Sequence, residues 1–375
     1  MEIRILGKEA CDFPYERENN LMTEEHNQIS STGDQSASSS LYTAEVGQDL
    51  ELQTTTISLA STDQSNSSRN TLVSIAPEFG SNMYRFRVGE HDLIYTDQVL
   101  LKKRDYTGAF VLWPFPNRVR DKRYTYQGQL YSLKDVHRPG GDAALVHGLV
   151  FDRPWQYTQP IIGPDEVSVT TYVDVNTDSP YYTAYPFDSR LSLTYTLSGT
   201  ELTVTYQVHN KSPRTLPFGF ALHPYFSTFA DKHDVLLSIP AQAVMEADDE
   251  MLPTGRIFDV RKVMYAMYDL REPTPVAYLK LDHVYTRLNR SALSIVDYTR
   301  LAMQLHISAT TDFTHLVIFT PQQIPSFCIE YQTCSTDAIN LHHQSSALRE
   351  AAHLLEVQPG ETYSGTLRYS VLFTA

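Results

Sequence analysis

Strict two-residue alternation of apolar and polar side chains constrains this sequence more than any other feature. Apolar residues occupy every second position from Leu191 to Leu197 and again from Leu202 to Val208, and Gly199 lies in the short segment between the two runs. A period of two buries one face of an extended strand, and a short Gly-containing link joins two such strands into an antiparallel hairpin. The chain is therefore expected to build antiparallel sheets that each bury one face.

Similar strand-like runs recur along the rest of the chain, whereas helical periodicity is scarce. The runs cover residues 167–175, 235–239, 276–281, 301–307, 316–320 and 366–373. The best helix candidate is short, from Ser345 to Leu355. Many strands with few helices between them predict an all-β fold, a large antiparallel β-sandwich with few short helices, and exclude a doubly wound parallel sheet. The sequence has no repeat of fixed period, which argues against a propeller.

The N-terminal region differs in composition from the rest. Long polar runs lie between residues 16 and 70, and such low hydrophobicity is typical of loops and extensions. We expect residues 1–41 to form a polar extension, partly flexible, in which the apolar run from Ile3 to Leu6 is a candidate strand. Residues 42–375 are then a single β-sandwich domain.

Charge and cysteine content exclude several classes of protein. A formal net charge of -14 argues against nucleic acid or an anionic membrane as a partner, because phosphate binding requires clustered Lys and Arg. Cys11, Cys328 and Cys334 are too few and too unevenly spaced for a disulfide framework or a zinc pattern. With no signal-like N-terminus and no apolar run long enough to span a bilayer, we expect a cytoplasmic protein without a membrane partner.

Two residues at the ends of apolar runs are candidates for acid and base chemistry. His223 follows the run from Phe218 to Leu222 and precedes Pro224, which interrupts a strand. Glu330 ends the apolar run that starts at Ile324, where an unpartnered carboxylate is costly to bury. A histidine among apolar neighbours is more often structural, and Glu330 suits a structural ion pair equally well.

Polar loops supply candidate ligand-binding groups. Asn117 and Arg118 lie in a basic turn that follows Trp113 and two prolines. A run of charges of this kind most often forms a solvent-exposed loop without a ligand. In a second loop, His147 lies before a glycine and close to Arg153 and Trp155. Imidazole, guanidinium and indole groups together suit a small polar ligand that has one apolar face.

Taken in order, these motifs resemble the aldose 1-epimerase family, whose members are galactose mutarotase-like, from about residue 70 to the end. The segments that carry the resemblance are residues 75–82, Pro116-Asn117-Arg118, His147-Gly148, Tyr185-Pro186-Phe187, His223-Pro224-Tyr225-Phe226, Leu281-Asp282-His283, Cys328-Ile329-Glu330-Tyr331-Gln332 and Gln358-Pro359-Gly360. The chain departs from the family pattern at Ser227 and at Leu222 and Tyr331, which are adjacent to the two candidate catalytic residues. These departures leave the preferred sugar open, and we expect Leu222 and Tyr331 to influence it.

The resemblance implies a large sandwich of the galactose mutarotase type and a mutarotase activity that needs no cofactor or metal. Glu330 would be the base and His223 the acid. Asn117, Arg118, His147 and Asp282 would hold the sugar, with Trp113 or Trp155 as an aromatic wall. The partner would be a small aldohexose, bound by a monomer or a homodimer.

Other activities remain open on the sequence. One alternative is a sugar-binding or regulatory protein that keeps the pocket without turnover. Another is a hexose-6-phosphate 1-epimerase, whose phosphate would be bound by Arg118, Arg120, Lys122 and Arg123. A glycosidase is less favoured, because that chemistry usually needs two carboxylates that flank the bond, and Asp282 is the only second candidate.

Overall fold

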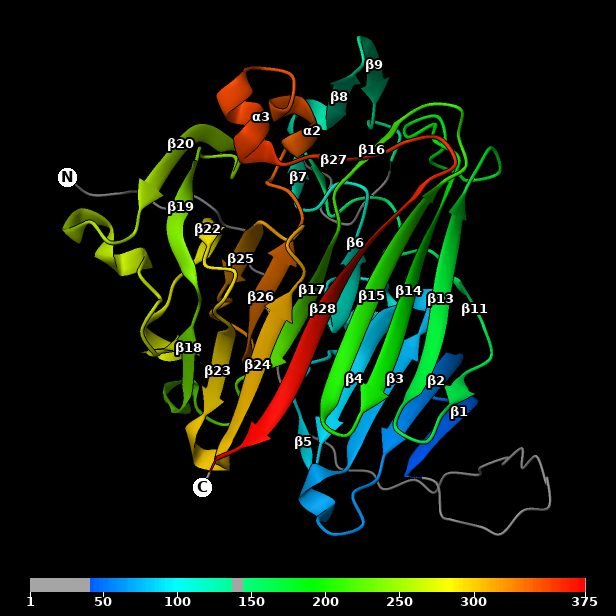
Figure 1. Cartoon of the computed structure of the whole chain (residues 1–375), viewed down its shortest axis with the longest axis vertical. Helices are drawn as coiled ribbons and strands as arrows, with labels where there is room; N and C mark the ends of the chain where they lie inside the picture. Colours follow the sequence, from blue (N-terminus) through cyan, green and yellow to red (C-terminus); the bar gives the residue numbers. More distant parts are fainter. Residues whose placement is uncertain (1–40, 137–143, 375) are drawn as a thin grey trace. The chain divides into compact units, whose positions relative to one another are not determined.

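The computed structural model describes residues 41–136 and 144–374, and most of these belong to two large antiparallel sheets (Figure 1). The first sheet has 12 strands, in the order β1 (Tyr42–Asp49), β2 (Thr54–Ser61), β3 (Thr71–Ala76), β4 (Asn82–Val88), β6 (Ala109–Leu112), β17 (Ala221–Ser227), β26 (Ser326–Gln332), β25 (His315–Phe319), β22 (Asp282–Leu288), β19 (Ala241–Ala247) and β20 (Pro253–Asp259), with β5 (His91–Asp92) beside β4.

The second sheet has 10 strands, in the order β11 (Gln156–Tyr157), β13 (Val167–Val175), β14 (Ser189–Ser198), β15 (Glu201–Asn210), β28 (Thr362–Phe373), β24 (Met303–Ala309), β23 (Ser294–Tyr298), β18 (Val235–Ser238) and β21 (Thr274–Pro275), with β12 (Ile161–Ile162) beside β13. Three small strand pairs complete the β structure: β7 (Arg118–Val119) with β10 (Leu145–Val146), β8 (Arg123–Tyr126) with β9 (Gln129–Ser132), and β16 (Leu216–Phe218) with β27 (Leu355–Val357).

Helices are few and short in the described part of the chain. The α-helices are α1 (Gln98–Lys102), α2 (Ala338–Leu341) and α3 (Ser346–Ala352). The 3-10 turns are η1 (Ser67–Arg69), η2 (Pro77–Phe79), η3 (Arg120–Lys122), η4 (Lys232–Asp234), η5 (Val263–Tyr268), η6 (Val276–Tyr278) and η7 (Thr299–Leu301). None of these helices is long and apolar enough to cross a membrane.

The inner faces of the two sheets form one hydrophobic core, which makes the fold a β-sandwich. Ile57, Phe226 and Ile329 from the first sheet lie in the same buried cluster as Leu193 and Tyr206 from the second. Buried and half-buried residues alternate along the whole of β13, as one core-facing surface requires. The prediction of a large antiparallel sandwich with few helices is therefore confirmed.

Most of the predicted elements form, with one exception. The hairpin is confirmed, because β14 and β15 pair Leu197 with Leu202, and the predicted helix forms as α3. The predicted strand at 276–281 is wrong, since this run begins with η6. Val276 and Leu279 are both buried, and a 3-10 turn places residues three apart on one side.

The predicted N-terminal extension lies outside the described residues apart from Leu41, and so does the candidate strand from Ile3 to Leu6. The domain boundary at residue 42 stays a prediction.

The centre of the first sheet is buried on both faces, unlike its edges. Every residue of β6 and of β26 is buried. Side chains that alternate with the core-facing ones in these strands therefore lie under a second layer of protein. His223 and Glu330 are among them, and their burial needs an explanation because both groups are ionisable.

Candidate active site

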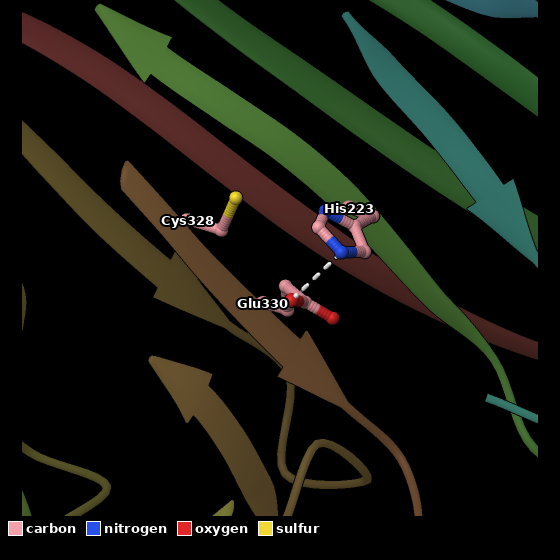
Figure 2. Close-up of side chains that lie close together, drawn as sticks. All are labelled: His223, Cys328 and Glu330. Carbon is pink, nitrogen blue, oxygen red and sulfur yellow. Dashed lines mark ion pairs between the residues drawn. The ribbon is translucent and has the colours of Figure 1, made fainter. Parts of the chain in front are cut away.

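His223 and Glu330 face each other across two neighbouring strands. β17 and β26 pair Ala221 with Gln332 and Tyr225 with Cys328, a register that puts His223 directly opposite Glu330. The Nε2 atom of His223 lies 3.2 Å from Oε1 of Glu330, and Figure 2 shows the two side chains turned toward each other. The structure thus brings together the two residues that the sequence predicts as acid and base.

Burial governs the electrostatics of this pair. It lowers the pKa of His223 from 6.5 to about 3 and raises the pKa of Glu330 well above its usual range, with the nearby Asp282 adding to the rise. Both pKa shifts disfavour the ionised form of the side chain, because burial removes the water that would hydrate the ion. Burial therefore favours a neutral carboxyl group on Glu330 beside a neutral imidazole on His223 over an ion pair.

Aromatic rings surround the imidazole of His223. Phe110 of β6 stacks on it with ring centroids 4.7 Å apart, and Tyr225 stacks at 4.9 Å. The ring of His147 meets it edge-on at 5.1 Å. These rings exclude water from the imidazole, and their role was not predicted, because Phe110 comes from a strand more than a hundred residues away.

Gln332 is a further site residue that the sequence analysis missed. Its Nε2 atom donates to Oε2 of Glu330 at 3.1 Å, so each oxygen of the carboxyl group has a partner. This contact opposes the rise in the pKa of Glu330. Two-residue alternation could have revealed it, since residues 330 and 332 of one strand share a face.

Asp282 lies on the same face of the sheet as the pair. It is opposite Phe319 in β25, which is in turn opposite Cys328 in β26, and Cys328 shares its face with Glu330. Burial raises the pKa of Asp282, and the Arg118 guanidinium opposes that rise. Asp282 and Arg118 both act electrostatically on Glu330, so the three groups belong to one site.

A cleft lies beside Asp282 and Arg118, the two charged groups that act electrostatically on Glu330. Its lining includes three of the predicted sugar-binding residues, Asn117, Arg118 and Asp282. Sequence reasoning did not predict the others: Met245, Glu246, Ala247, Met251, Pro253, His283, Val284 and Thr336.

The fourth predicted sugar-binding residue, His147, lies next to the strand pair that carries Arg118. The strands β7 and β10 pair Arg118 with Val146, and the guanidinium of Arg118 donates to Oδ1 of Asn117 at 3.0 Å. His147 does not line the cleft, but its ring reaches His223. The four predicted sugar-binding residues thus lie in the neighbourhood of the carboxyl–imidazole pair.

Two expectations about neighbouring residues are wrong. Trp113 and Trp155 are both buried in the core between the sheets, so neither forms an aromatic wall for a ligand. Leu222 and Tyr331 flank the pair in sequence but also belong to that core, because adjacent residues of a strand point to opposite faces. Neither residue lines the cleft, so the expectation that they influence the choice of ligand is wrong.

Comparison with known proteins places the chain in a family. A family model described as aldose 1-epimerase matches residues 65–370. The chain therefore belongs to the aldose 1-epimerase family, as the sequence motifs predict.

Individual relatives are distant. The galactose mutarotase of Rattus norvegicus is 28% identical over 198 residues, which cover 49% of this chain and 51% of that protein, so the chain spans about half the length of this relative. The uncharacterized protein YihR of Escherichia coli (strain K12) is 26% identical over 234 residues, 61% of this chain and 71% of that protein.

Among solved structures, a galactose mutarotase-like protein from Clostridium acetobutylicum superposes with a TM-score of 0.76 at 19% identity, covering 89% of this chain and 98% of that one. The galactose 1-epimerase from Lactobacillus acidophilus gives a TM-score of 0.68 at 14% identity, covering 89% and 98%. These likenesses establish the galactose mutarotase-like fold.

Proposed function

We propose that this protein is an aldose 1-epimerase that interconverts the α and β anomers of a free, unphosphorylated aldose. The observation that carries the proposal is the buried contact of 3.2 Å between His223 and Glu330, near a cleft whose lining includes Asn117, Arg118 and Asp282. Family membership supports the reaction class.

Ring opening needs one base and one acid. Transfer of the shared proton from Glu330 to His223 gives a carboxylate and an imidazolium. The carboxylate then takes the proton of the C1 hydroxyl, the C1–O5 bond breaks as the C1 carbonyl forms, and the imidazolium protonates O5. Rotation about C1–C2 and the reverse transfers close the ring on the other face, so the number of protons on the pair is unchanged over the cycle.

Two positioned groups of this kind suffice for the reaction. General acid or base catalysis contributes on the order of 10² to 10⁴ in rate, and orientation of the sugar adds to it. The guanidinium of Arg118 and the amide of Asn117 can donate to sugar hydroxyls, while Asp282 accepts. The carboxylate of the half-buried Asp282 also makes the cleft favourable for positively charged groups.

The arrangement of cations favours an unphosphorylated sugar. Arg118 is the only Lys or Arg among the described residues that line the cleft. Arg120 is engaged by Asp248 at 3.0 Å and by the buried Asp337 at 3.8 Å, and Arg123 is paired with Asp121 at 3.1 Å. Arg120, Lys122 and Arg123 do not line the cleft, which speaks against the hexose-6-phosphate alternative.

Polarimetry on freshly dissolved α-D-glucose and α-D-galactose tests the proposal. The protein should accelerate mutarotation, and Glu330→Gln should abolish the acceleration. Glu201→Gln is a matched control, because Glu201 pairs with Arg368 on the second sheet, and it should keep the full rate. Sugar-induced thermal stabilisation without any acceleration by the wild type would instead support a sugar-binding protein.

A further inference from the structure

A buried thiol completes a cluster of three different ligand types around the candidate catalytic pair. Cys328 lies opposite Tyr225 and two residues before Glu330, on the same face of β26. One ligand atom each from His223, Cys328 and Glu330 lies within 4.8 Å of the other two, and Figure 2 shows the three side chains together. All three residues are buried.

The thiol has no role in ring opening, and it is unpartnered. Among the described residues no hydrogen bond to the Cys328 thiol is found, although the side chain is completely buried. The Nδ1 atom of His223 and the Oε1 atom of Gln332 are also buried without a partner in the described part of the chain. Such unsatisfied groups next to a carboxyl–imidazole pair are expected where a ligand binds.

The geometry fits a small tetrahedral ion. Zinc bonds to nitrogen, oxygen and sulfur are about 2.0 to 2.3 Å long, which sets neighbouring ligand atoms roughly 3.5 Å apart. The cluster, with its atoms within 4.8 Å, has to contract by only about 1 Å. A thiolate and a carboxylate together neutralise a divalent charge, so the complex would be neutral in a buried environment.

We propose that His223, Cys328 and Glu330 form a binding site for a borderline divalent cation such as Zn²⁺ or Co²⁺. A mixed set of imidazole, thiolate and carboxylate ligands selects such ions over Mg²⁺ and Ca²⁺, which prefer oxygen ligands alone. The sequence shows no zinc pattern, because the ligands come from two strands more than a hundred residues apart.

The ion occupies the two atoms that exchange the proton, Nε2 of His223 and a carboxyl oxygen of Glu330. Metal binding and ring opening therefore exclude each other, and the ion is an inhibitor that competes with the sugar. This consequence rests on the proposed function, whereas metal binding itself does not.

Titration of the full-length protein with Co²⁺ under anaerobic conditions tests the site without any sugar. We expect one equivalent to bind with a thiolate-to-cobalt charge-transfer band in the near ultraviolet, and Zn²⁺ but not Mg²⁺ to abolish the band. Cys328→Ser should lose the band. Cys334→Ser should keep it, because Cys334 is equally buried but lies outside the cluster.

The absence of the band in the wild type, or its survival in Cys328→Ser, would overturn the proposal. If Cys328→Ser does not fold, as circular dichroism would reveal, the loss of the band in His223→Gln serves the same purpose. A second experiment measures inhibition of mutarotation by Zn²⁺, with each protein compared with its own metal-free rate. Zn²⁺ should inhibit the wild type, and it should inhibit Cys328→Ser at least about tenfold more weakly. A protein that binds Co²⁺ but does not turn over sugar would contradict the proposed function and leave the metal site intact.

Discussion

The backbone N–H of His147 donates to the carbonyl oxygen of Asn117 at 2.8 Å, and both residues adopt left-handed conformations, with φ of 64° and 61°. Neither is a glycine, so each stores backbone strain on the order of 1 kcal/mol or more. The neighbouring strands β7 and β10 hold this geometry in place. Two predicted sugar-binding residues are thus fixed by one strained contact.

Gly148 follows His147 and packs closely against the backbone of Trp113, so its replacement should disturb the site. Gly148 has φ of +73°, and a Cβ atom there would lie 2.3 Å from the carbonyl oxygen of Trp113. Gly148→Ala should therefore destabilise the protein by roughly 2 kcal/mol or more and raise KM for the sugar, as measured by urea unfolding and initial rates.

Gly199→Ala is the control for that experiment. Gly199 also has a positive φ, but nothing lies within 4 Å of the added Cβ, so only the conformational cost of about 1 kcal/mol is expected. Equal losses in the two variants would show that close packing against Trp113 is unimportant.

The pH dependence of the reaction should reflect the buried pair. The active free enzyme carries one proton on His223 and Glu330, and a second proton binds only near the lowered pKa of His223, about 3. We expect kcat/KM to stay high well below pH 6.5 and to fall only as the pH approaches this value, measured in the range where circular dichroism shows a folded protein. An acid limb centred on the ordinary histidine value of about 6.5 would contradict the burial argument.

Arg118 should serve sugar binding more than chemistry. Loss of a hydrogen bond from a charged group weakens binding by about 1.5 to 3 kcal/mol, so Arg118→Met should raise KM by tenfold or more. Arg120→Met is the matched control, because Arg120 is engaged by Asp248 and Asp337 and does not line the cleft. A similar increase of KM in both variants would argue against the cleft as the sugar site.

Much of this arrangement could be predicted from local sequence, because alternation reports directly on which face of a strand is buried. It placed the hairpin of β14 and β15 and predicted the sandwich. The mistakes have the same physical origin: Leu222 and Tyr331 neighbour the site in sequence, yet they face the core, whereas Gln332 was overlooked although it shares a face with Glu330.

Long-range packing could not be predicted in this way. Phe110 contacts His223 because β6 and β17 are neighbours in the sheet. A local sequence pattern does not predict the order of strands in a sheet. For the same reason the indoles of Trp113 and Trp155 looked available for a ligand, although the fold buries both.

The carboxyl group of Glu330 should reduce stability at neutral pH. Its pKa is raised above the ordinary value of 4.5, so the folded state binds the proton more tightly than the unfolded state. The stability from this group is present in full below pH 4.5 and is lost as the pH rises toward the folded-state pKa. Glu330→Gln should therefore become more stable relative to the wild type as the pH rises, by up to about 1.4 kcal/mol per pH unit.

Urea unfolding at about pH 5 and about pH 7 measures this difference. Glu201→Gln, which removes a carboxylate beside Arg368 on the second sheet, is the control for the loss of an acidic group far from the pair. A difference between Glu330→Gln and the wild type that is the same at both pH values would contradict the raised pKa.

The central claim is that His223 and Glu330 act as one unit on a shared proton. Its most direct test is the anomer exchange rate, measured by exchange NMR for the wild type, Glu330→Gln, His223→Asn and the double variant. We predict that each single change lowers the rate by about 10² or more and that the double variant is hardly slower than either, because the unit is already broken. Full activity in either single variant, or losses that multiply in the double variant, would contradict the account.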